Sequence, residues 1–243
     1  KAKVRVALYS AGSTFENRPF RYVENVSNFQ FSFSGEEKKL LDYASAAGGI
    51  DASVKRISDV TGSIDLRHFS ADNLALALWG TTAVLSATPI VAEAGYKIVP
   101  LMFIPTKRLI NTSVAPVVKK GATTVLADDY TVSAGGITIA SSITTGGVAS
   151  GDAITIDYTP QASNDVQALI SSAPDVSIHV EGVNEVDGKY TLFKGWKAKL
   201  GVAQNVSLIG DDFGTLTVSL TFQKDETIIA GGKSQYFEMQ QAA

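Results

Sequence analysis

The stretch TLTVSLTFQ, residues 215–223, alternates apolar and small polar side chains without interruption. Leu216, Val218 and Leu220 fall on one side of an extended chain, while threonine and serine fall on the other. Because successive side chains of a β-strand point to opposite faces, this alternation predicts a strand with one face in the core and one toward water. Half-buried strands of this kind are typical of antiparallel sheets.

The same period of two recurs earlier in the chain. NFQFSFS, residues 28–34, places its three phenylalanines on one face, and VTGSIDLRH, residues 60–68, does the same with valine, isoleucine and leucine. Further strand candidates are VSIHVE (176–181), KYTLF (189–193) and WKAKLGV (196–202). The sequence therefore predicts a mainly β protein, built as an antiparallel β-sandwich or barrel.

One segment departs from this rhythm and predicts a helix. In SADNLALALWG, residues 70–80, Ser70 is a favoured N-cap residue, Asp72 follows in the first turn, and Gly80 is a stop signal. Leucine and alanine fill the positions between them at helical spacing. We expect one α-helix at about residues 70–80, flanking the sheet.

Residues 111–159 have a different composition, with few charges and many Thr, Ser, Ala and Gly. Short strand-like runs alternate there with turn signals, including the glycine pairs at 135–136 and 146–147. This pattern predicts a small all-β subdomain inserted into a main domain made of residues 1–110 and 160–243. The alternative is that the stretch belongs to one continuous sandwich.

The composition excludes several classes of protein. The chain has 243 residues, a formal net charge of −3 and no cysteine, so disulfides and cysteine metal sites are ruled out. A weakly acidic balance gives no strong attraction to nucleic acid or to an anionic membrane. The apolar runs LALALW and IVPLMFIP are far shorter than the ~20 residues of a membrane-spanning helix.

Candidate catalytic residues are scarce. The two histidines, His68 and His179, lie in strand-like contexts without a recognisable motif. The acidic pairs at 128–129 and 211–212 lie at expected turns, where aspartate is favoured for its own backbone hydrogen bonds. No phosphate-binding glycine motif is present. We therefore predict a non-enzymatic protein without metal or cofactor, suited to contacting other proteins.

Between two strand-like stretches lies EEKKLLDYASAAGGIDASVKRISD, residues 36–59. Its middle, residues 42–54, has neither the apolar stripe of a helix nor the signature of a tight hairpin turn. We interpret it as a long loop, and loops of this length in compact domains usually have a function or are disordered.

The order of these features resembles the major tail tube proteins of long, non-contractile-tailed bacteriophages. The similarity lies in the strand-to-helix junction RHFSADNLALAL, residues 67–78, and in the ending LIGDDFGTLTVSLTFQKD, residues 208–225. It covers about residues 20–110 and 175–228 and includes no catalytic motif. The fold of this family is shared with type VI secretion tube proteins.

The resemblance implies a virion protein that is assembled in the cytoplasm of the bacterial host. Subunits of this family form hexameric rings that stack into a hollow tail tube with a β-barrel inner wall. The implied partners are further copies of the chain, the tape-measure protein, and tail terminator and baseplate proteins. Double-stranded DNA passes through the lumen to the host without specific binding, and no membrane is involved. An insert in the lumen would block DNA, so residues 111–159 are expected on the outer surface.

In this family the long loop between two early strands reaches toward the neighbouring ring. The resemblance thus makes Tyr43 and Ile50 candidate apolar anchors of ring stacking. The full set of candidate interface residues is Asp42, Tyr43, Gly48, Gly49, Ile50, Asp51, Lys55 and Arg56. The alternatives are a secretion-type tube or tail-terminator ring protein, and a carbohydrate-binding β-sandwich, which would need an exposed aromatic platform from Trp79 or Trp196.

Overall fold

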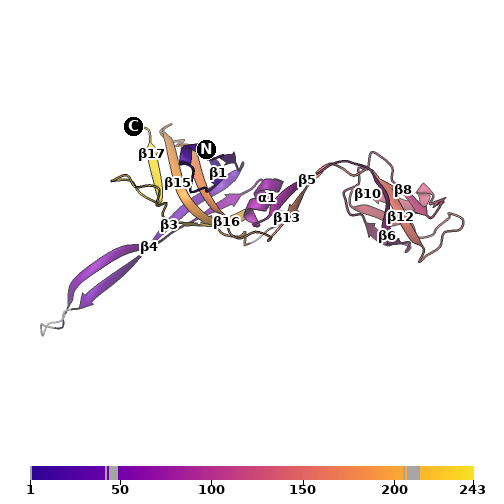
Figure 1. Ribbon diagram of the computed structural model, residues 1–243, viewed down its shortest axis with the longest axis horizontal. Coiled ribbons are helices and arrows are strands. Elements are labelled where there is room, and N and C mark those ends of the chain that lie inside the picture. Colours follow the sequence, from indigo (N-terminus) through magenta and orange to yellow (C-terminus); the bar gives the residue numbers. More distant parts are fainter. Residues whose placement is uncertain (1, 42, 44–48, 205, 207–213) are drawn as a thin grey trace. The chain divides into compact units, whose positions relative to one another are not determined.

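The computed structural model describes residues 2–41, 43, 49–204, 206 and 214–243, and it is mainly β (Figure 1). The chain splits into two compact units. The main unit comprises Lys1–Thr82 and Val166–Ala243, and the inserted unit comprises Ala83–Asp165. The predicted fold class is confirmed, because antiparallel sheets and, within the described ranges, a single α-helix make up the structure.

Eight of the described strands form one antiparallel sheet in the main unit, in the order β2-β1-β14-β15-β16-β4-β3, with β17 also paired to β15. They are β1 (Ala2–Leu8), β2 (Arg21–Tyr22), β3 (Val26–Leu41), β4 (Ile50–Leu66), β14 (Asp175–Val183), β15 (Tyr190–Leu200), β16 (Leu216–Phe222) and β17 (Phe237–Gln241). A short 3-10 helix, η1 (Phe15–Asn17), follows β1.

The sheet divides at β15, where β16 and β17 pair with different parts of the same strand. This division lets one part of the sheet cover the core. β17 pairs with Thr191–Gly195 and β16 with Ala198–Leu200, so the two strands leave the same edge of β15 in succession. On β17, Phe237 reaches back to β3, with its ring 5.6 Å from that of Phe31. The sheet thus folds over on itself as a sandwich does. The alternating residues of β16 and β4 supply many of the buried side chains of this core, others come from β1, β14 and β15, and Phe29 and Phe31 of β3 pack against them.

Helix α1 (Ala71–Ala77) covers one end of this core. The Ser70 side chain caps it by accepting a hydrogen bond from the backbone N–H of Asn73 at 3.2 Å. The helix ends before the expected glycine stop, because Trp79 adopts a left-handed φ of 49°. Gly80 has a different role, since a Cβ there would lie 2.2 Å from the carbonyl oxygen of Gln167. Only glycine allows this close approach of the backbone.

The inserted unit has two small antiparallel sheets, in the orders β6-β12-β8-β9 and β10-β11-β7. The strands are β6 (Ile90–Lys97), β7 (Phe103–Pro105), β8 (Val117–Lys120), β9 (Thr123–Thr124), β10 (Tyr130–Ser133), β11 (Gly136–Ile139) and β12 (Ala153–Tyr158). A separate core of buried side chains, among them Ile98, Ile137 and Ile156, holds them together. Strands β5 (Thr81–Leu85) and β13 (Ser163–Gln167) pair with each other where the chain passes between the two units.

The expected boundaries of the insert, residues 111–159, need correction to Ala83–Asp165. The reason is strand pairing: β12 lies between β8 and β6, and β11 pairs with β7. Strands before residue 111 are therefore built into the sheets of the inserted unit.

The acidic pair at 128–129 lies in the 3-10 turn η2 (Ala127–Asp129), as the turn interpretation requires. Asp129 is buried and accepts hydrogen bonds from the backbone N–H groups of Thr144 and Thr145, each at 2.8 Å. Hydrogen bonds from the Thr145 hydroxyl and then from the backbone N–H and hydroxyl of Thr144 lower the pKa of Asp129 to about 2. The second pair, at 211–212, lies outside the described residues.

We expect Asp129→Asn to weaken the acid dependence of stability. The Asp129 carboxyl titrates near 3.9 when unfolded and near 2 when folded, so its stabilisation is present above pH ~4 and is lost as the pH falls through 2. Scanning calorimetry of the full chain from pH 7 to pH 2 should show a smaller fall of Tm in the variant, from a lower starting value. The exposed neighbour provides the control, Asp128→Asn, which should follow the wild type. Equal slopes for wild type and Asp129→Asn would contradict the assignment.

Candidate functional site

The most prominent feature of the main unit is a hairpin that extends beyond its sheet (Figure 1). β3 and β4 remain paired from Val26↔Leu66 out to Leu41↔Ile50, whereas β16 pairs only with Thr61–Leu66 of β4. The outer part is thus a two-stranded ribbon. This corrects the interpretation of residues 36–59 as one long loop, because β3 continues to Leu41 and β4 begins at Ile50.

Cross-strand pairs explain why this outer ribbon is stable as strands. Glu36 lies opposite Arg56 and Glu37 lies opposite Lys55. Opposite charges directly across an antiparallel pair contribute roughly 0.2–1 kcal/mol each. Neither face of the ribbon covers a core, so apolar and charged residues occur on both faces and the alternating pattern is absent.

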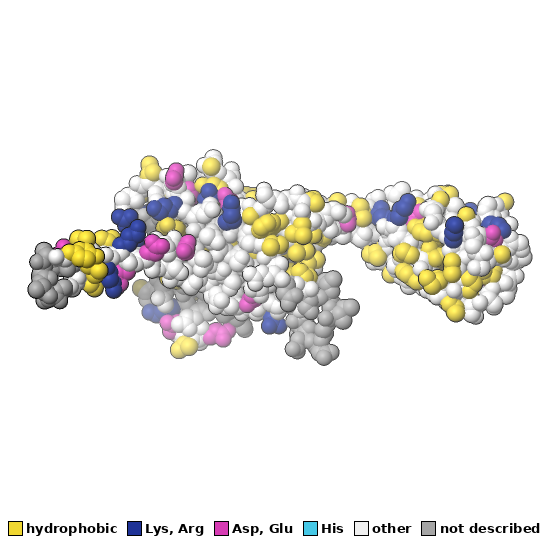
Figure 2. Space-filling view, turned by 90° about the horizontal axis from the view of Figure 1, so that it is seen from below, with side chains coloured by type: hydrophobic (Ala, Val, Ile, Leu, Met, Phe, Trp, Pro, Cys, Tyr) yellow, Lys and Arg dark blue, Asp and Glu magenta, His cyan; other side chains and the backbone are white. Residues whose placement is uncertain are grey.

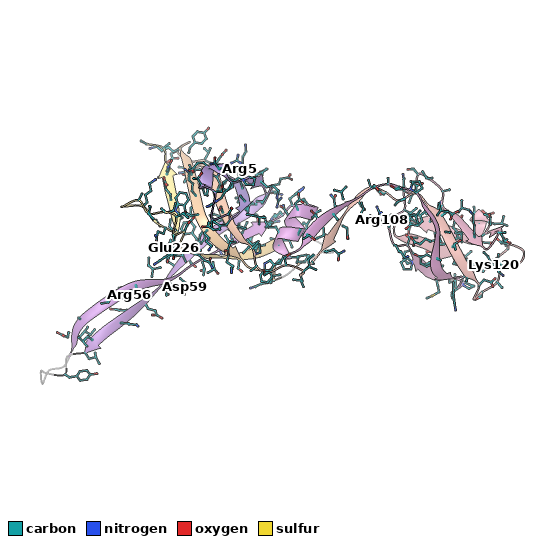
Figure 3. The ribbon with its side chains drawn as sticks, viewed as in Figure 1. Arg5, Arg56, Asp59, Arg108, Lys120 and Glu226 are labelled. Carbon is teal, nitrogen blue, oxygen red and sulfur yellow. The ribbon has the colours of Figure 1, made fainter. Side chains whose placement is uncertain are left out.

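The structure brings most of the predicted interface residues together on this hairpin. Ile50 begins β4, Asp51 lies at a bulge with no cross-strand partner, and Tyr43 is 87% exposed. Arg56 lies on the ribbon itself (Figure 3). Lys55 lies there too, Gly49 has a φ of 144°, and Asp42 and Gly48 lie outside the described residues.

Sequence reasoning missed apolar residues beside that set. Leu40, Leu41 and Val54 are exposed large side chains near the end of the hairpin. Figure 2 shows apolar side chains gathered there, next to the grey atoms. We call Leu40, Leu41, Tyr43, Ile50 and Val54 the apolar tip. Exposed apolar groups in a cluster mark interaction sites, and the dipeptide Leu40-Leu41 next to a charged run was the signal available in the sequence.

The outer edge of β3 is a second candidate surface. β3 is the last strand of the sheet and has 16 residues, so one row of its backbone N–H and C=O groups faces no other described strand. Its first ten residues, VSNFQFSFSG, contain neither a charge nor a proline, the usual devices that block edge pairing. Charges begin only at Glu36. This edge is suited to pairing with another chain.

A third surface is the outer face of β3, β4 and β16, opposite the core. Its side chains form three cross-strand rows: Asn28, Asp65 and Thr217; Gln30, Ser63 and Ser219; Ser32, Thr61 and Thr221. Hydroxyl groups bridge the strands, with the Oγ of Ser32 2.9 Å from the Oγ1 of Thr61. We call these rows the polar face. Asp65 is its single charged residue, so the surface is hydrophilic and almost neutral.

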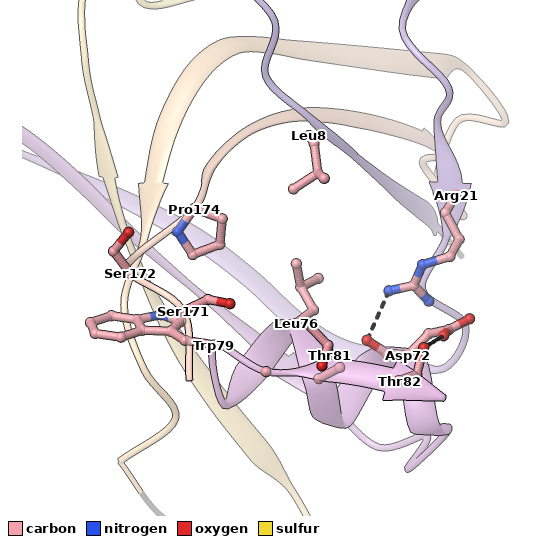
Figure 4. Close-up of a pocket in the computed structure, with 12 residues that line it drawn as sticks. Leu8, Arg21, Asp72, Leu76, Trp79, Thr81, Thr82, Ser171, Ser172 and Pro174 are labelled. Carbon is pink, nitrogen blue, oxygen red and sulfur yellow. Dashed lines mark hydrogen bonds between the residues drawn. The ribbon is translucent and has the colours of Figure 1, made fainter. Parts of the chain in front are cut away.

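A hollow of the main unit lies beside α1, and Figure 4 shows it. Its volume is about 600 Å³, and its apolar wall includes Leu8, Leu76, Trp79 and Pro174. A smaller hollow of about 240 Å³ extends it and shares Leu8 and Leu76. The indole N–H of Trp79 donates to the carbonyl of Leu200 at 3.1 Å, which fixes the ring. We call the larger hollow the α1 pocket.

Two charged residues lie at the α1 pocket, Arg21 and Asp72. The Arg21 guanidinium donates to the Oδ1 of Asn73 at 2.6 Å and to the backbone carbonyl of Asp72 at 3.4 Å, and neither acceptor is a carboxylate. The Asp72 carboxylate accepts from the Thr82 hydroxyl at 3.4 Å. The pocket therefore presents one cation and one anion beside an apolar wall.

The two histidines lie apart from these surfaces. His68 is 3.0 Å from Glu24 at the surface, and His179 contacts the ring of Phe15. Burial, followed by the nearby charge of Arg5, lowers the pKa of His179. Across the described ranges, no three His, Asp or Glu side chains gather as metal ligands. None of the helices that the structure describes has the length and apolar character to cross a membrane.

The chain belongs to the family described as protein of unknown function UCP028589, which matches residues 3–240. The match begins in β1, ends in β17 and so runs through both units. No curated protein matches the chain.

Proposed function

We propose that this protein is the structural subunit of a phage tail tube, forming hexameric rings that stack into a hollow conduit for DNA. The observation that carries the proposal is the long hairpin of β3 and β4, with an unprotected edge at its base and an apolar tip at its end. The edge serves lateral association within a ring, and the apolar tip serves axial association between rings.

Lateral association uses the free edge of β3. A strand edge without charges pairs readily with another strand, and the opposite end of the same sheet is the two-residue strand β2. Pairing of β3 in one copy with the other side of the next copy joins different surfaces. Such head-to-tail contacts form a closed ring when the rotation between copies allows it.

The polar face suits the inner wall of such a ring. DNA is bound without sequence preference mainly by lysine and arginine contacts to phosphate. Rows of serine, threonine and amide side chains with Asp65 as their one charge offer no such contact. DNA and the tape-measure protein would therefore slide past this wall. The inserted unit belongs on the outer surface under this proposal, since a domain in the lumen would obstruct passage.

Axial association uses the apolar tip. In this proposal Tyr43 and Ile50 anchor the contact to the neighbouring ring, together with Leu40 and Leu41, and Asp51 adds a charge. Lys55 and Arg56 lie opposite glutamates across the ribbon, so their role is to hold the hairpin straight. Tail terminator and baseplate proteins would meet the same surfaces at the two ends of the tube.

Negative-stain electron microscopy of the purified protein and of tailed virions tests the proposal. We expect six-fold rings or tubes from the protein, and labelling along the tail shaft by an antibody against it. A protein that forms neither rings nor tubes and is absent from tails would contradict the proposal. Rings combined with absence from the shaft would favour a secretion-type tube or a terminator ring.

A carbohydrate-binding role has less support than the tail-tube proposal. Trp196 is only 5% exposed and lies against Phe15, so it offers no open stacking surface. Trp79 is held by its hydrogen bond at the edge of the α1 pocket.

A further inference from the structure

We infer that the α1 pocket receives the apolar tip of a second copy of this chain. The inference rests on the proposed function, because it names the site on the neighbouring ring that the hairpin contacts. It also applies to any head-to-tail assembly of the protein, whether or not a tube forms.

The first step is the exposure of both surfaces. Ile50 on the apolar tip is 55% exposed, and Leu8 at the mouth of the α1 pocket is 64% exposed. Burying leucine and isoleucine side chains at a contact removes apolar surface from water and so favours association. Several such side chains on each surface give a contact that, repeated around a ring, becomes strong through multivalency.

The second step is that the tip of a chain cannot enter the pocket of the same chain. β4 has 17 residues, which at ~3.3 Å per residue separate its two ends by roughly 55 Å. The tip lies at the beginning of β4, and α1 follows the end of β4 at Ala71. The two surfaces therefore lie at opposite ends of the hairpin, and their contact must join different copies.

The third step is charge complementarity. Beside the apolar tip lie Lys38, which shares a face with Leu40, and Asp51. Among the described residues, the ion pair in this region joins Lys39 to Glu37 at 3.8 Å. Lys38 and Asp51 take no part in it. The α1 pocket carries Arg21 and Asp72, also without an oppositely charged partner in the described structure. Each surface thus offers one cation and one anion, which can form two intermolecular ion pairs and fix the register of docking.

A head-to-tail contact of this kind repeats along one direction. A tip that fills the pocket of the next copy leaves that copy's own tip free, so the contact propagates as an open filament. The tip–pocket contact would thus set the axial repeat of the assembly, while the β3 edge closes each ring.

Thiol cross-linking tests the contact directly, because the native chain contains no cysteine. Ile50→Cys and Leu8→Cys protein are mixed and treated with a short bismaleimide, and cross-linked peptides are identified by mass spectrometry. We expect the 50–8 product to exceed the 50–186 product of a control mixture by at least tenfold. The control is Val186→Cys, an apolar position that is 94% exposed. Comparable yields of the two products would overturn the inference.

Mixing two blocked variants provides the second test. Ile50→Asp removes the tip and keeps the pocket, and Leu8→Asp removes the pocket and keeps the tip. Each variant alone should fail to stack, and circular dichroism should show an unchanged fold since both positions are exposed. Their equimolar mixture should form a complex of twice the mass in sedimentation, because one functional tip still meets one functional pocket. A mixture that remains at the mass of the separate variants, or a single variant that stacks normally, would overturn the inference.

The outcomes separate this inference from the proposed function. Tubes without the 50–8 product would leave the tail-tube proposal intact and place the tip elsewhere on the neighbouring ring. The 50–8 product from a protein that is absent from tails would support the contact and contradict the tube.

Discussion

Replacing Glu37–Lys55 with the two-residue turn Asn-Gly is expected to give a folded subunit that forms rings and no tubes. Glu36 and Arg56 are direct cross-strand partners, so a two-residue turn can close the hairpin at that pair. The change removes the apolar tip but leaves Thr61–Leu66, the part of β4 that pairs with β16. The edge of β3 from Val26 to Gly35 also remains.

Electron microscopy should show the mean tube length falling at least tenfold, to single or paired rings, and circular dichroism should show retained β structure. The matched control is the charge exchange Glu36→Arg with Arg56→Glu. It exchanges the two charges of a cross-strand residue pair and leaves the tip unchanged, so tubes of normal length are expected. Normal tubes from the shortened variant would mean that stacking does not depend on the hairpin.

The core strands and the helix could be predicted because one face of each is buried. Leu216, Val218 and Leu220 alternate with hydroxyl residues, and all three are buried as predicted. Ser70 likewise caps α1 as predicted. A local sequence pattern is sufficient to predict a strand or helix where burial of one face determines which residues are apolar.

The prediction of a long loop at the outer hairpin was wrong because neither face of that hairpin is buried. Between Glu36 and Arg56 both faces of the ribbon are open, so no alternation is required. What holds the strands is the pairing of residues from two segments, which becomes visible only once the register is known.

The boundary of the inserted unit was missed because β6 is irregular. Its pairing with β12 shifts register twice, and Ala92 and Gly95 have φ angles of 54° and 108°. These breaks remove the period of two from residues 90–97. The α1 pocket was beyond sequence reasoning as well, because Leu8, Leu76 and Pro174 come from segments far apart in the chain.

A buried ion pair connects distant segments of the main unit, and no sequence motif predicted it. Arg18 and Asp225 are almost fully buried, and their charged groups lie 3.6 Å apart. The Arg18 guanidinium also donates to the Ser177 hydroxyl at 2.7 Å and to the Trp196 carbonyl at 3.0 Å. It thus ties the segment after β1 to β14, to β15 and to the chain beyond β16.

The environment of Asp225 keeps it charged. Burial by itself raises its pKa, but hydrogen bonds from Thr227 and Tyr9 and the charge of Arg18 outweigh burial and lower the pKa below its usual value. Near neutral pH the carboxylate is therefore ionised inside the protein. Removing its cation leaves a buried charge without compensation.

Arg18→Met should accordingly destabilise the protein by about 3–5 kcal/mol, the usual effect of breaking one partner of a buried pair. Urea unfolding at pH 7, followed by the tryptophan fluorescence of the chain, would measure it. The partly exposed pair of Arg5 and Glu181, 2.8 Å apart, offers a control in Arg5→Met, for which a loss of at most ~1 kcal/mol is expected.

The double variant Arg18→Met with Asp225→Asn separates two explanations of that loss. If the uncompensated carboxylate causes the destabilisation, neutralising it should recover part of the stability, so the double variant should be more stable than Arg18→Met alone. If the loss came only from missing packing by the arginine side chain, the second change would add to the first. A double variant less stable than Arg18→Met would thus show that Arg18 acts through its contacts with Ser177 and Trp196 and not through its charge.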